Sequence, residues 1–300
     1  MDGILNIYKE KGYTSHDVVA KLRGICRMRR IGHTGTLDPD AEGVLPVCLG
    51  KATKLCELLT DKEKEYRAEV LLGVVTDTQD MSGTVLSEHS VDCSEEELIA
   101  VIRSFVGVYD QIPPMYSAIK MDGKRLYELA RAGVEVERKA RRVEIKKIEI
   151  EAISLPRFTI RVNCSKGTYI RTLCHDIGQK LGCGASMETL LRTKSGQFLL
   201  EDSMKLEEVQ RKMAEGSLEE KLVLPDALFM AYPEARVLEE GEKLLYNGNP
   251  MPLEFLERDS RERPGEGSMV RIYDRYGEFI GLYIYHSDRN WYKPKTLFLG

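Results

Sequence analysis

The sequence predicts an α+β protein, with a mixed, largely antiparallel central sheet flanked by helices and a small all-β domain at the C-terminal end. Alternating apolar and polar residues, typical of strands, fill 65–78, 141–153 and 157–164. Helical segments are interspersed among these strands, several of which are hairpin-like neighbours, and this favours an antiparallel sheet. From residue 269 onward, short runs rich in Ile, Tyr and Phe surround turns, which indicates a second, smaller sheet.

The first elements are short. Residues 3–9 form a strand-like run, and the next segment, 15–26, has the apolar spacing of a helix that Thr14 or Ser15 would cap. Residues 50–61 predict another helix. The next stretch, 65–78, alternates and contains three Val and Tyr66, residue types that suit a strand in a half-buried sheet position.

A capping box marks the following helix. Ser94 is followed three residues later by Glu97, so a helix is expected over 94–107. After the two long strands, the chain turns through Gly167 into a helix within 165–182.

The composition changes near Pro225, where residues 221–238 read as a connection. We therefore expect a larger domain over 1–228 and a small β domain over 229–300, which is near the lower size limit for independent folding.

Composition bounds the class of protein. The 300 residues are 42% hydrophobic and 31% charged, and the longest apolar runs are too short to cross a bilayer. The N-terminus lacks a basic segment followed by an apolar core, so no secretory signal is expected. Seven cysteines without a CxxC pattern favour free thiols in a reducing compartment, and hence a cytoplasmic protein.

The charge is unevenly distributed. The formal net charge is −4, yet residues 21–30 and 137–147 are strongly basic, while acid is concentrated in 94–97 and 234–266. Such segregation permits a local positive face, although solvated faces of helices and strands would give the same runs.

The stretch 31–47, IGHTGTLDPDAEGVLPV, places three carboxylates among glycines and prolines. Pro39 fixes its own φ and biases Asp38 toward an extended conformation, so Asp38 is the most constrained of the three acids. Asp40 and Glu42 follow the proline and fit a solvated loop. Asp38 is thus a candidate functional acid, the alternative being an Asx turn in which it binds local N–H groups.

Two further stretches carry candidate site residues. In CSKGTYIRTLCHDIG, Tyr169 and Arg171 follow a glycine turn at the start of a helix, where a guanidinium could pair with a carboxylate or a phosphate, or remain a surface arginine. Tyr66 lies at a strand start, and Asp77 and Asp80 border a turn that they are expected to form.

The segment 111–133 combines a Pro-Pro kink with Lys120, Lys124, Arg125 and aromatic residues, which suits contact with a nucleic-acid backbone. No pattern predicts a metal site, because Cys174, His175 and Cys183 match no zinc spacing. Neither a P-loop nor a GxGxxG after a strand is present, so no nucleotide cofactor is expected.

Four separated blocks, within 32–54, 64–83, 112–133 and 164–178, resemble the bacterial tRNA pseudouridine-55 synthase family, the TruB type of pseudouridine synthase. The resemblance implies a pseudouridine-synthase catalytic domain, and the C-terminal module is similar to a PUA-type RNA-binding domain. The implied reaction is the isomerisation of uridine 55 in the T-loop of tRNA, by a monomer and without a cofactor.

By this resemblance Asp38 is the catalytic aspartate. In its ionised form it could attack C1′ of the sugar, attack C6 of the base or remove a sugar proton. Arg171 would hold Asp38 ionised and oriented, since an opposite charge depresses a carboxylate pKa. Tyr66 would stack on the base and assist proton removal at C5. Tyr169 would line the pocket, and His33 would fill the space that the extruded base leaves.

Four more residues complete the implied substrate-binding set: Lys120 on the RNA backbone, Lys64 near Tyr66, and Gly35 and Leu191. Two other functions remain open from the residues alone. A tRNA-binding chaperone would keep the basic segments but leave Asp38, Tyr66 and Arg171 unexplained, and a glycoside hydrolase would need a second placed carboxylate.

Overall fold

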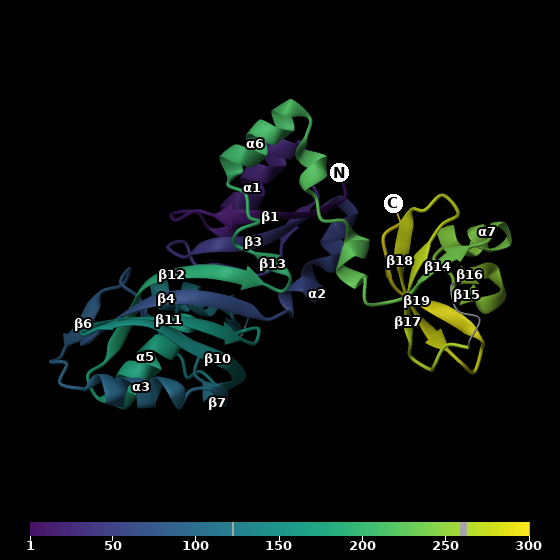
Figure 1. Ribbon diagram of the computed structural model, residues 1–300. Helices are drawn as coiled ribbons and strands as arrows, with labels where there is room; N and C mark the ends of the chain where they lie inside the picture. The colour runs from purple at the N-terminus through teal and green to yellow at the C-terminus, as the bar shows by residue number, and fades with distance from the viewer. Residues whose placement is uncertain (122, 259–262, 300) are drawn as a thin grey trace.

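The computed structural model describes residues 1–121, 123–258 and 263–299. Within these ranges nine strands form one large sheet, with β1, β3, β12, β4, β11, β10 and β7 in spatial order, β2 paired to β3 and β13 paired to β12 (Figure 1). Their bounds are β1 Gly3–Lys9, β2 Ile31–His33, β3 Glu42–Leu49, β4 Lys64–Leu72, β7 Gly107–Gln111, β10 Arg141–Ser154, β11 Arg157–Cys164, β12 Ala185–Ser195 and β13 Phe198–Leu199. Every pair is antiparallel except β3 with β12, which confirms the mixed, largely antiparallel sheet.

Helices flank this sheet in two groups. α3 (Glu95–Arg103) and α5 (Ile170–Leu181) pack on each other against the half formed by β4, β12 and β10, while α1 (Ser15–Cys26) and α6 (Leu206–Glu215) pack together over β1. The capping box predicted at Ser94 is formed. Thr14, one of the two expected caps of α1, caps that helix and forms a second capping box with Asp17. Within the described part of the chain, no helix has the length and apolar character needed to span a bilayer.

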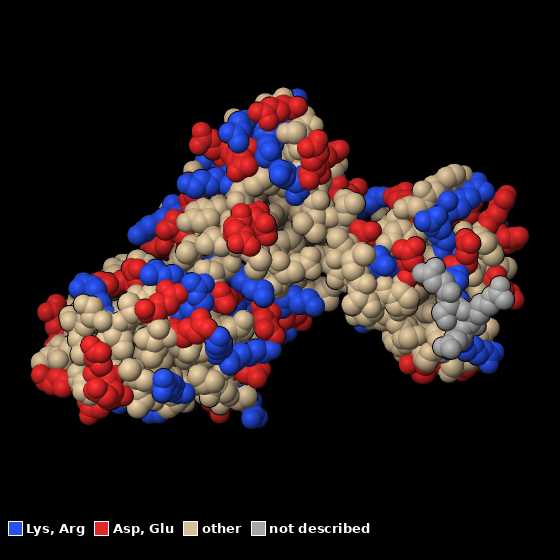
Figure 2. All heavy atoms as spheres, in the orientation of Figure 1, with Lys and Arg blue, Asp and Glu red and all other residues tan. Residues whose placement is uncertain are grey.

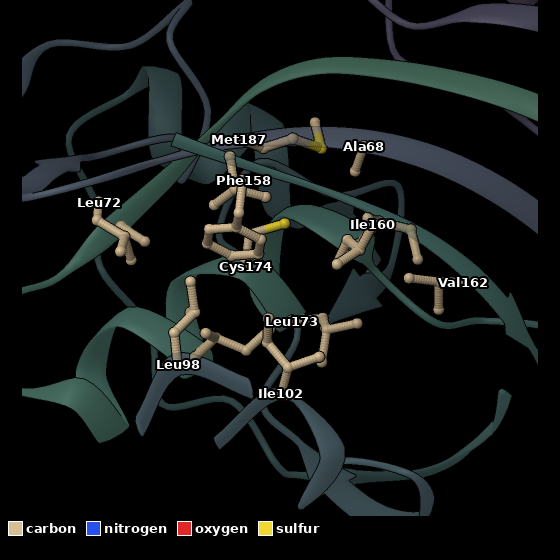
Figure 3. Packing of buried hydrophobic residues seen from close by; sticks show 14 of the residues in the cluster. Ala68, Leu72, Leu98, Ile102, Phe158, Ile160, Val162, Leu173, Cys174 and Met187 are labelled. Carbon is tan, nitrogen blue, oxygen red and sulfur yellow. The ribbon is translucent and has the colours of Figure 1, made fainter. Parts of the chain in front are cut away.

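The core beneath α5 fixes the position of that helix (Figure 3). Leu173 and Cys174 of α5 lie with Leu98 of α3 against Phe158 of the sheet, and each of the four is at most 2% exposed. Gly178 lets α5 approach β12 closely, because a Cβ there would overlap the backbone of 184–185. The N-terminal end of α5, which carries the candidate arginine, is therefore rigidly placed.

The structure corrects several element predictions. The helix expected over 50–61 is a 3-10 helix, η1 (Gly50–Leu55), that continues into the short α2 (Cys56–Thr60). The strand expected over 65–78 breaks at Gly73, which has φ +84°; after it a small hairpin of β5 (Val74–Thr76) and β6 (Val85–Glu88) projects. β3 and β12 are not among the strands predicted from the sequence, although both lie in the middle of the sheet.

Residues between β7 and β10 form a separate extension. A two-stranded hairpin of β8 (Lys120–Met121) and β9 (Lys124–Arg125) leads into α4 (Leu126–Arg131). Asp122 lies outside the described residues.

In its described residues the C-terminal region is a six-stranded sheet with the short helix α7 (Glu242–Tyr246) and two single-turn 3-10 helices, which confirms the predicted all-β character. Its strands are β14 Glu234–Val237, β15 Met251–Pro252, β16 Leu256–Arg258, β17 Met269–Tyr273, β18 Phe279–His286 and β19 Trp291–Leu297. It stands beside the larger sheet, next to η1 and α2 (Figure 1). Lys54 Nζ donates to the Leu297 carbonyl at 2.7 Å across this junction, and Lys51 pairs with Glu278 at 3.3 Å.

Candidate active site

The glycine- and proline-rich loop between β2 and β3 is fixed by bonds to its backbone. Lys9, fully buried, donates from Nζ to the Pro39 carbonyl at 3.1 Å, and the Gly12 N–H donates to the same oxygen at 2.9 Å. The Leu37 N–H donates to Ser15 Oγ at 2.9 Å. These contacts come from β1, from the turn after it and from α1, so the loop is held from outside.

The Asp38 side chain is thereby directed toward Arg171. Arg171 Nη2 lies 3.2 Å from Asp38 Oδ2, and it donates to the Tyr116 carbonyl at 2.6 Å. The Asp38 side chain is 39% exposed and that of Arg171 is 6% exposed. Among the described residues, no local backbone N–H donates to the Asp38 carboxylate, so the Asx-turn alternative does not describe this loop.

Asp80 also lies at this site and contacts Arg171, whereas the sequence predicts only a turn-forming role for it. It does form the expected turn, because its Oδ1 accepts from Thr78 Oγ1 at 2.7 Å and from the Ser82 N–H at 3.0 Å. Its other oxygen, Oδ2, lies 3.5 Å from Arg171 Nη1. The guanidinium therefore lies between two carboxylates. The signal available was the DTQDMS run, in which Thr78 and Ser82 fix one carboxylate oxygen and leave the other free.

The pKa of Asp38 differs from the expectation. Burial raises the pKa of Asp38 above its ordinary value; the Arg171 charge acts in the opposite direction, and the neighbouring charge of Asp80 raises the pKa further. The Arg171 charge does lower the pKa of Asp38, the direction expected, but desolvation outweighs it here. Asp38 is therefore a weaker acid than an exposed aspartate, and its charge state responds to both neighbours.

Strand register sets the floor of the site. Tyr66 on β4 lies directly opposite Arg192 on β12, and side chains two residues apart share a face of a strand. Leu190 and Arg192 therefore face the same side as Tyr66, and both line the site. Leu191 pairs with Arg67 on the opposite face, so its predicted place in the pocket is wrong by one position.

A cleft of about 1080 Å³ joins these residues and is lined by Asp38, Tyr66, Asp80, Tyr169, Arg171 and Arg192, among others. Its lining, within the described residues, carries eight Lys or Arg and four Asp, an excess that suits a polyanionic ligand. The basic residues on its rim include Arg125, Arg131, Arg141, Arg142 and Lys166. Figure 2 shows Lys and Arg mixed with Asp and Glu over the face it draws, so this excess belongs to the cleft and not to that whole face.

Tyr169 and Lys64 both lie in this cleft, as expected. The Gln111 side chain holds the Tyr169 backbone at both ends, accepting from its N–H at 2.8 Å and donating to its carbonyl at 3.0 Å. Lys64 is 6% exposed and donates from Nζ to the carbonyls of Thr60 and Lys62 at 2.5 and 2.6 Å. Burial lowers the pKa of Lys64 to about 8.

The remaining candidates are less central. Gly35 lines the cleft with φ +131°. His33 does not line it, but its ring lies edge-on to that of His16, which does, at 5.3 Å between centroids. Burial lowers the pKa of His33 to about 4, so its ring is neutral. Lys120 is exposed on β8 and also lies outside the lining. Among the described residues, no group of His, Cys, Asp or Glu could hold a metal ion.

Comparison with known proteins assigns the family. The model of the TruB family pseudouridylate synthase N-terminal domain matches residues 23–170, and that of the tRNA pseudouridylate synthase B C-terminal domain matches 171–230. A protein of Lachnoclostridium phytofermentans named tRNA pseudouridine synthase B is 48% identical over 100% of both chains. The chain belongs to the TruB family.

Other members agree with this assignment. The tRNA pseudouridine synthase B of Clostridium tetani is 44% identical over 94% of this chain and 95% of its own. Among solved structures, a chain of a Cbf5-Nop10-Gar1 complex is 26% identical with a TM-score of 0.73, and a chain of an H/ACA RNP bound to a substrate RNA containing 2′-deoxyuridine has a TM-score of 0.71 at 26% identity. Each match covers 99% of this chain and 85% of the other. As a TruB-family pseudouridine synthase the protein is an enzyme, an isomerase.

Proposed function

We propose that this protein isomerises uridine 55 in the T-loop of tRNA to pseudouridine, with Asp38, in its ionised form, as the catalytic aspartate. The observation that carries the proposal is the contact of Asp38 with Arg171 at 3.2 Å in a cleft that Tyr66 also lines. Relatives of equal length that are named tRNA pseudouridine synthase B support tRNA as the substrate.

The chemistry needs one ionised carboxylate at an extruded nucleotide. Asp38 attacks C1′, attacks C6 or removes a sugar proton, and the rearrangement exchanges the N1–C1′ bond for a C5–C1′ bond. Arg171 orients the carboxylate. Tyr66 stacks on the base and its hydroxyl takes part in proton removal at C5, while Tyr169 closes the other side of the pocket.

Base extrusion costs about a few kcal/mol, and contacts around the loop must offset it. We propose that His33, which is neutral and packed beside His16, fills the space left by the base. Lys120 and the arginines on the cleft rim would contact the RNA backbone, so recognition would depend on the shape of the folded T-arm.

We place the domain boundary at residues 228/229, with the C-terminal sheet acting as a PUA-like RNA-binding domain. The junction supports this division, because it is bridged from η1 by Lys54 and Lys51. We also propose that the enzyme acts on tRNA as a monomer in the cytoplasm, without a cofactor.

The test uses unmodified tRNA transcripts and the purified protein, with pseudouridine mapped at single-nucleotide resolution. The proposal requires modification at position 55 alone, none in a transcript with cytidine at 55, and retained activity on an isolated T-arm hairpin. Modification at another position, or none in the full tRNA, would contradict it.

A further inference from the structure

Arg192 is a buried cation at the cleft floor for which the reaction described above has no use. It is 1% exposed, and its guanidinium donates to two backbone carbonyls, from Nε to Val44 at 2.6 Å and from Nη2 to Gly35 at 3.3 Å. Among the described residues, no carboxylate forms an ion pair with it. A buried charge without a counter-charge is costly, so a compensating role is expected.

Its neighbours share this arrangement. Lys9 and Lys64 are also buried and also donate to carbonyl oxygens instead of carboxylates. Burial lowers the pKa of both lysines to about 8, and the charge of Arg192 acts in the same direction. For Lys9, the charges of Asp38, Glu42 and Asp40 act the opposite way and more strongly than that of Arg192. None of these three cations forms an ion pair with a carboxylate of its own among the described residues. Their combined positive charge therefore acts on groups in the cleft.

Tyr66 is the cleft residue placed to use this field. It lies opposite Arg192 across the β4–β12 pair, so the two side chains stand on one face of the sheet. Burial raises the pKa of the Tyr66 hydroxyl, whereas the charge of Arg192 and a hydrogen bond with it lower that pKa. Without Arg192, an anionic Tyr66 oxygen would be buried beside Asp38 with less positive charge near it.

We propose that Arg192 is a positioning residue that orients the Tyr66 hydroxyl and stabilises its anion while Tyr66 takes the C5 proton of the rearranged base. This inference rests on the proposed function. In the step, the Tyr66 hydroxyl releases its own proton through water to N1, and the Tyr66 oxygen receives the proton from C5. The C5–H bond breaks, its electron pair restores the C5=C6 double bond, and the electron pair of the N1=C6 bond moves to N1, where it forms the new N1–H bond. No proton is gained or lost overall, as an isomerisation requires.

Loss of activity alone would not identify this role, because Arg192 also holds the loop carbonyls of Gly35 and Val44. Lys9 provides a matched control. It is a buried cation at the end of β1, and it holds the same loop through a hydrogen bond to the Pro39 carbonyl. A variant of Lys9 should disturb Asp38 and the early bond exchange, whereas a variant of Arg192 should also slow the late proton transfer.

The experiment compares tRNA containing uridine with tRNA containing uridine deuterated at C5, under single-turnover conditions, for the wild type, R192Q, R192K and K9Q. We expect R192Q to lose about 10- to 100-fold in rate, less than the about 10²–10⁴-fold that a general base itself contributes, because Tyr66 is still present. Its protium-to-deuterium rate ratio should exceed that of K9Q, with R192K recovering part of the rate.

An equal isotope effect in R192Q and K9Q would overturn the inference and reduce Arg192 to a loop support, as would wild-type rates in R192Q. If R192Q does not fold, R192K carries the same comparison, because it keeps the charge but loses the two-carbonyl geometry. Failure of the wild type to modify uridine 55 would instead contradict the proposed function, so the two results are distinguishable.

Discussion

Arg171 Nη2 lies 3.2 Å from Asp38 Oδ2, although 133 positions separate the two residues in the chain. One comes from a loop fixed by backbone bonds, and the other from the first turn of a helix packed on the sheet. The same guanidinium also faces Asp80 at 3.5 Å. The pKa of Asp38 therefore depends on burial and, among the neighbouring charges, most strongly on Arg171 and then on Asp80, so substitutions of these two residues should move it in opposite directions.

The acid limb of the pH profile tests this balance. Asp38 must be ionised to react, so kcat/KM should rise with pH through its raised pKa. Arg171→Gln removes the charge that lowers this pKa, so the limb should move to higher pH. Asp80→Asn removes a charge that raises it, so the limb should move to lower pH. The measurement is kcat/KM for tRNA from about pH 4 to about pH 9, a range that begins near the ordinary carboxyl pKa and extends well above it.

Both variants will also lose rate, because Arg171 and Asp80 hold each other in place. The direction of the limb, not the height of the plateau, is therefore the result that counts. Shifts of both limbs to the same side would contradict the assignment of that limb to Asp38.

Asp38→Asn should abolish turnover while leaving RNA binding nearly intact. The amide keeps the shape of the side chain but supplies neither a nucleophile nor a base, and loss of such a group costs about 10²–10⁴-fold or more. Pseudouridine formation and the Kd for tRNA would be measured in parallel, with Asp202→Asn, on the exposed turn after β13, as a matched control. Substantial turnover by the Asp38→Asn variant would show that another group does the chemistry.

Much of this site could be predicted from the sequence, because residues next to Asp38 and Arg171 in the chain indicate their importance. Pro39 and the surrounding glycines singled out Asp38 from three neighbouring acids, and the glycine turn before α5 singled out Arg171. Capping signals located α1 and α3 correctly. In each case the deciding interactions lie within a few residues, so a single sequence contains them.

What the sequence did not reveal depends on strand pairing over long separations. β3 and β12 pair in parallel through Leu191 and Arg192, from opposite halves of the chain, and neither strand alternates clearly because both are largely buried. Without that register, the sequence does not show which face of the sheet the Leu191 side chain lies on. Nor does it distinguish Arg192 from an ordinary basic residue. Lys9 was hidden as well: its bonds to the Glu10 and Tyr13 carbonyls are local, but the bond that ties it to the Asp38 loop goes to the Pro39 carbonyl, 30 positions away.

The salt dependence of tRNA binding should show which basic residues on and near the cleft rim contact RNA phosphates. Arg142→Gln and Lys120→Gln should each weaken binding and reduce the slope of log K against log salt by about 0.7–0.9, the change expected when one phosphate is no longer neutralised. Arg142 lines the cleft, and Lys120 stands on the β8–β9 hairpin outside it. Lys146→Gln is the control, because Lys146 pairs with Glu63 away from the cleft lining. An unchanged slope for Lys120→Gln would place that lysine off the RNA.

Gly43→Ala should destabilise the protein, because the parallel pairing of β3 with β12 depends on this glycine. Gly43 has φ +103° and faces Arg192 so closely that a Cβ would overlap the Arg192 carbonyl. Both the strained backbone and the clash oppose a side chain, so we expect a loss of more than about 1 kcal/mol in the free energy of unfolding.

The same added methyl group should have the opposite effect at Gly24. This glycine lies in α1 with nothing within 4 Å of a built Cβ, so Gly24→Ala should raise stability by up to about 1 kcal/mol through helix propensity. Thermal unfolding of both variants, side by side, would show Tm shifts of opposite sign, each about 2–4 °C per kcal/mol for a domain of this size. Equal Tm values would mean that β3 and β12 do not approach as closely as Arg192 and Gly43 indicate, and the floor beneath Tyr66 would then have to be placed differently.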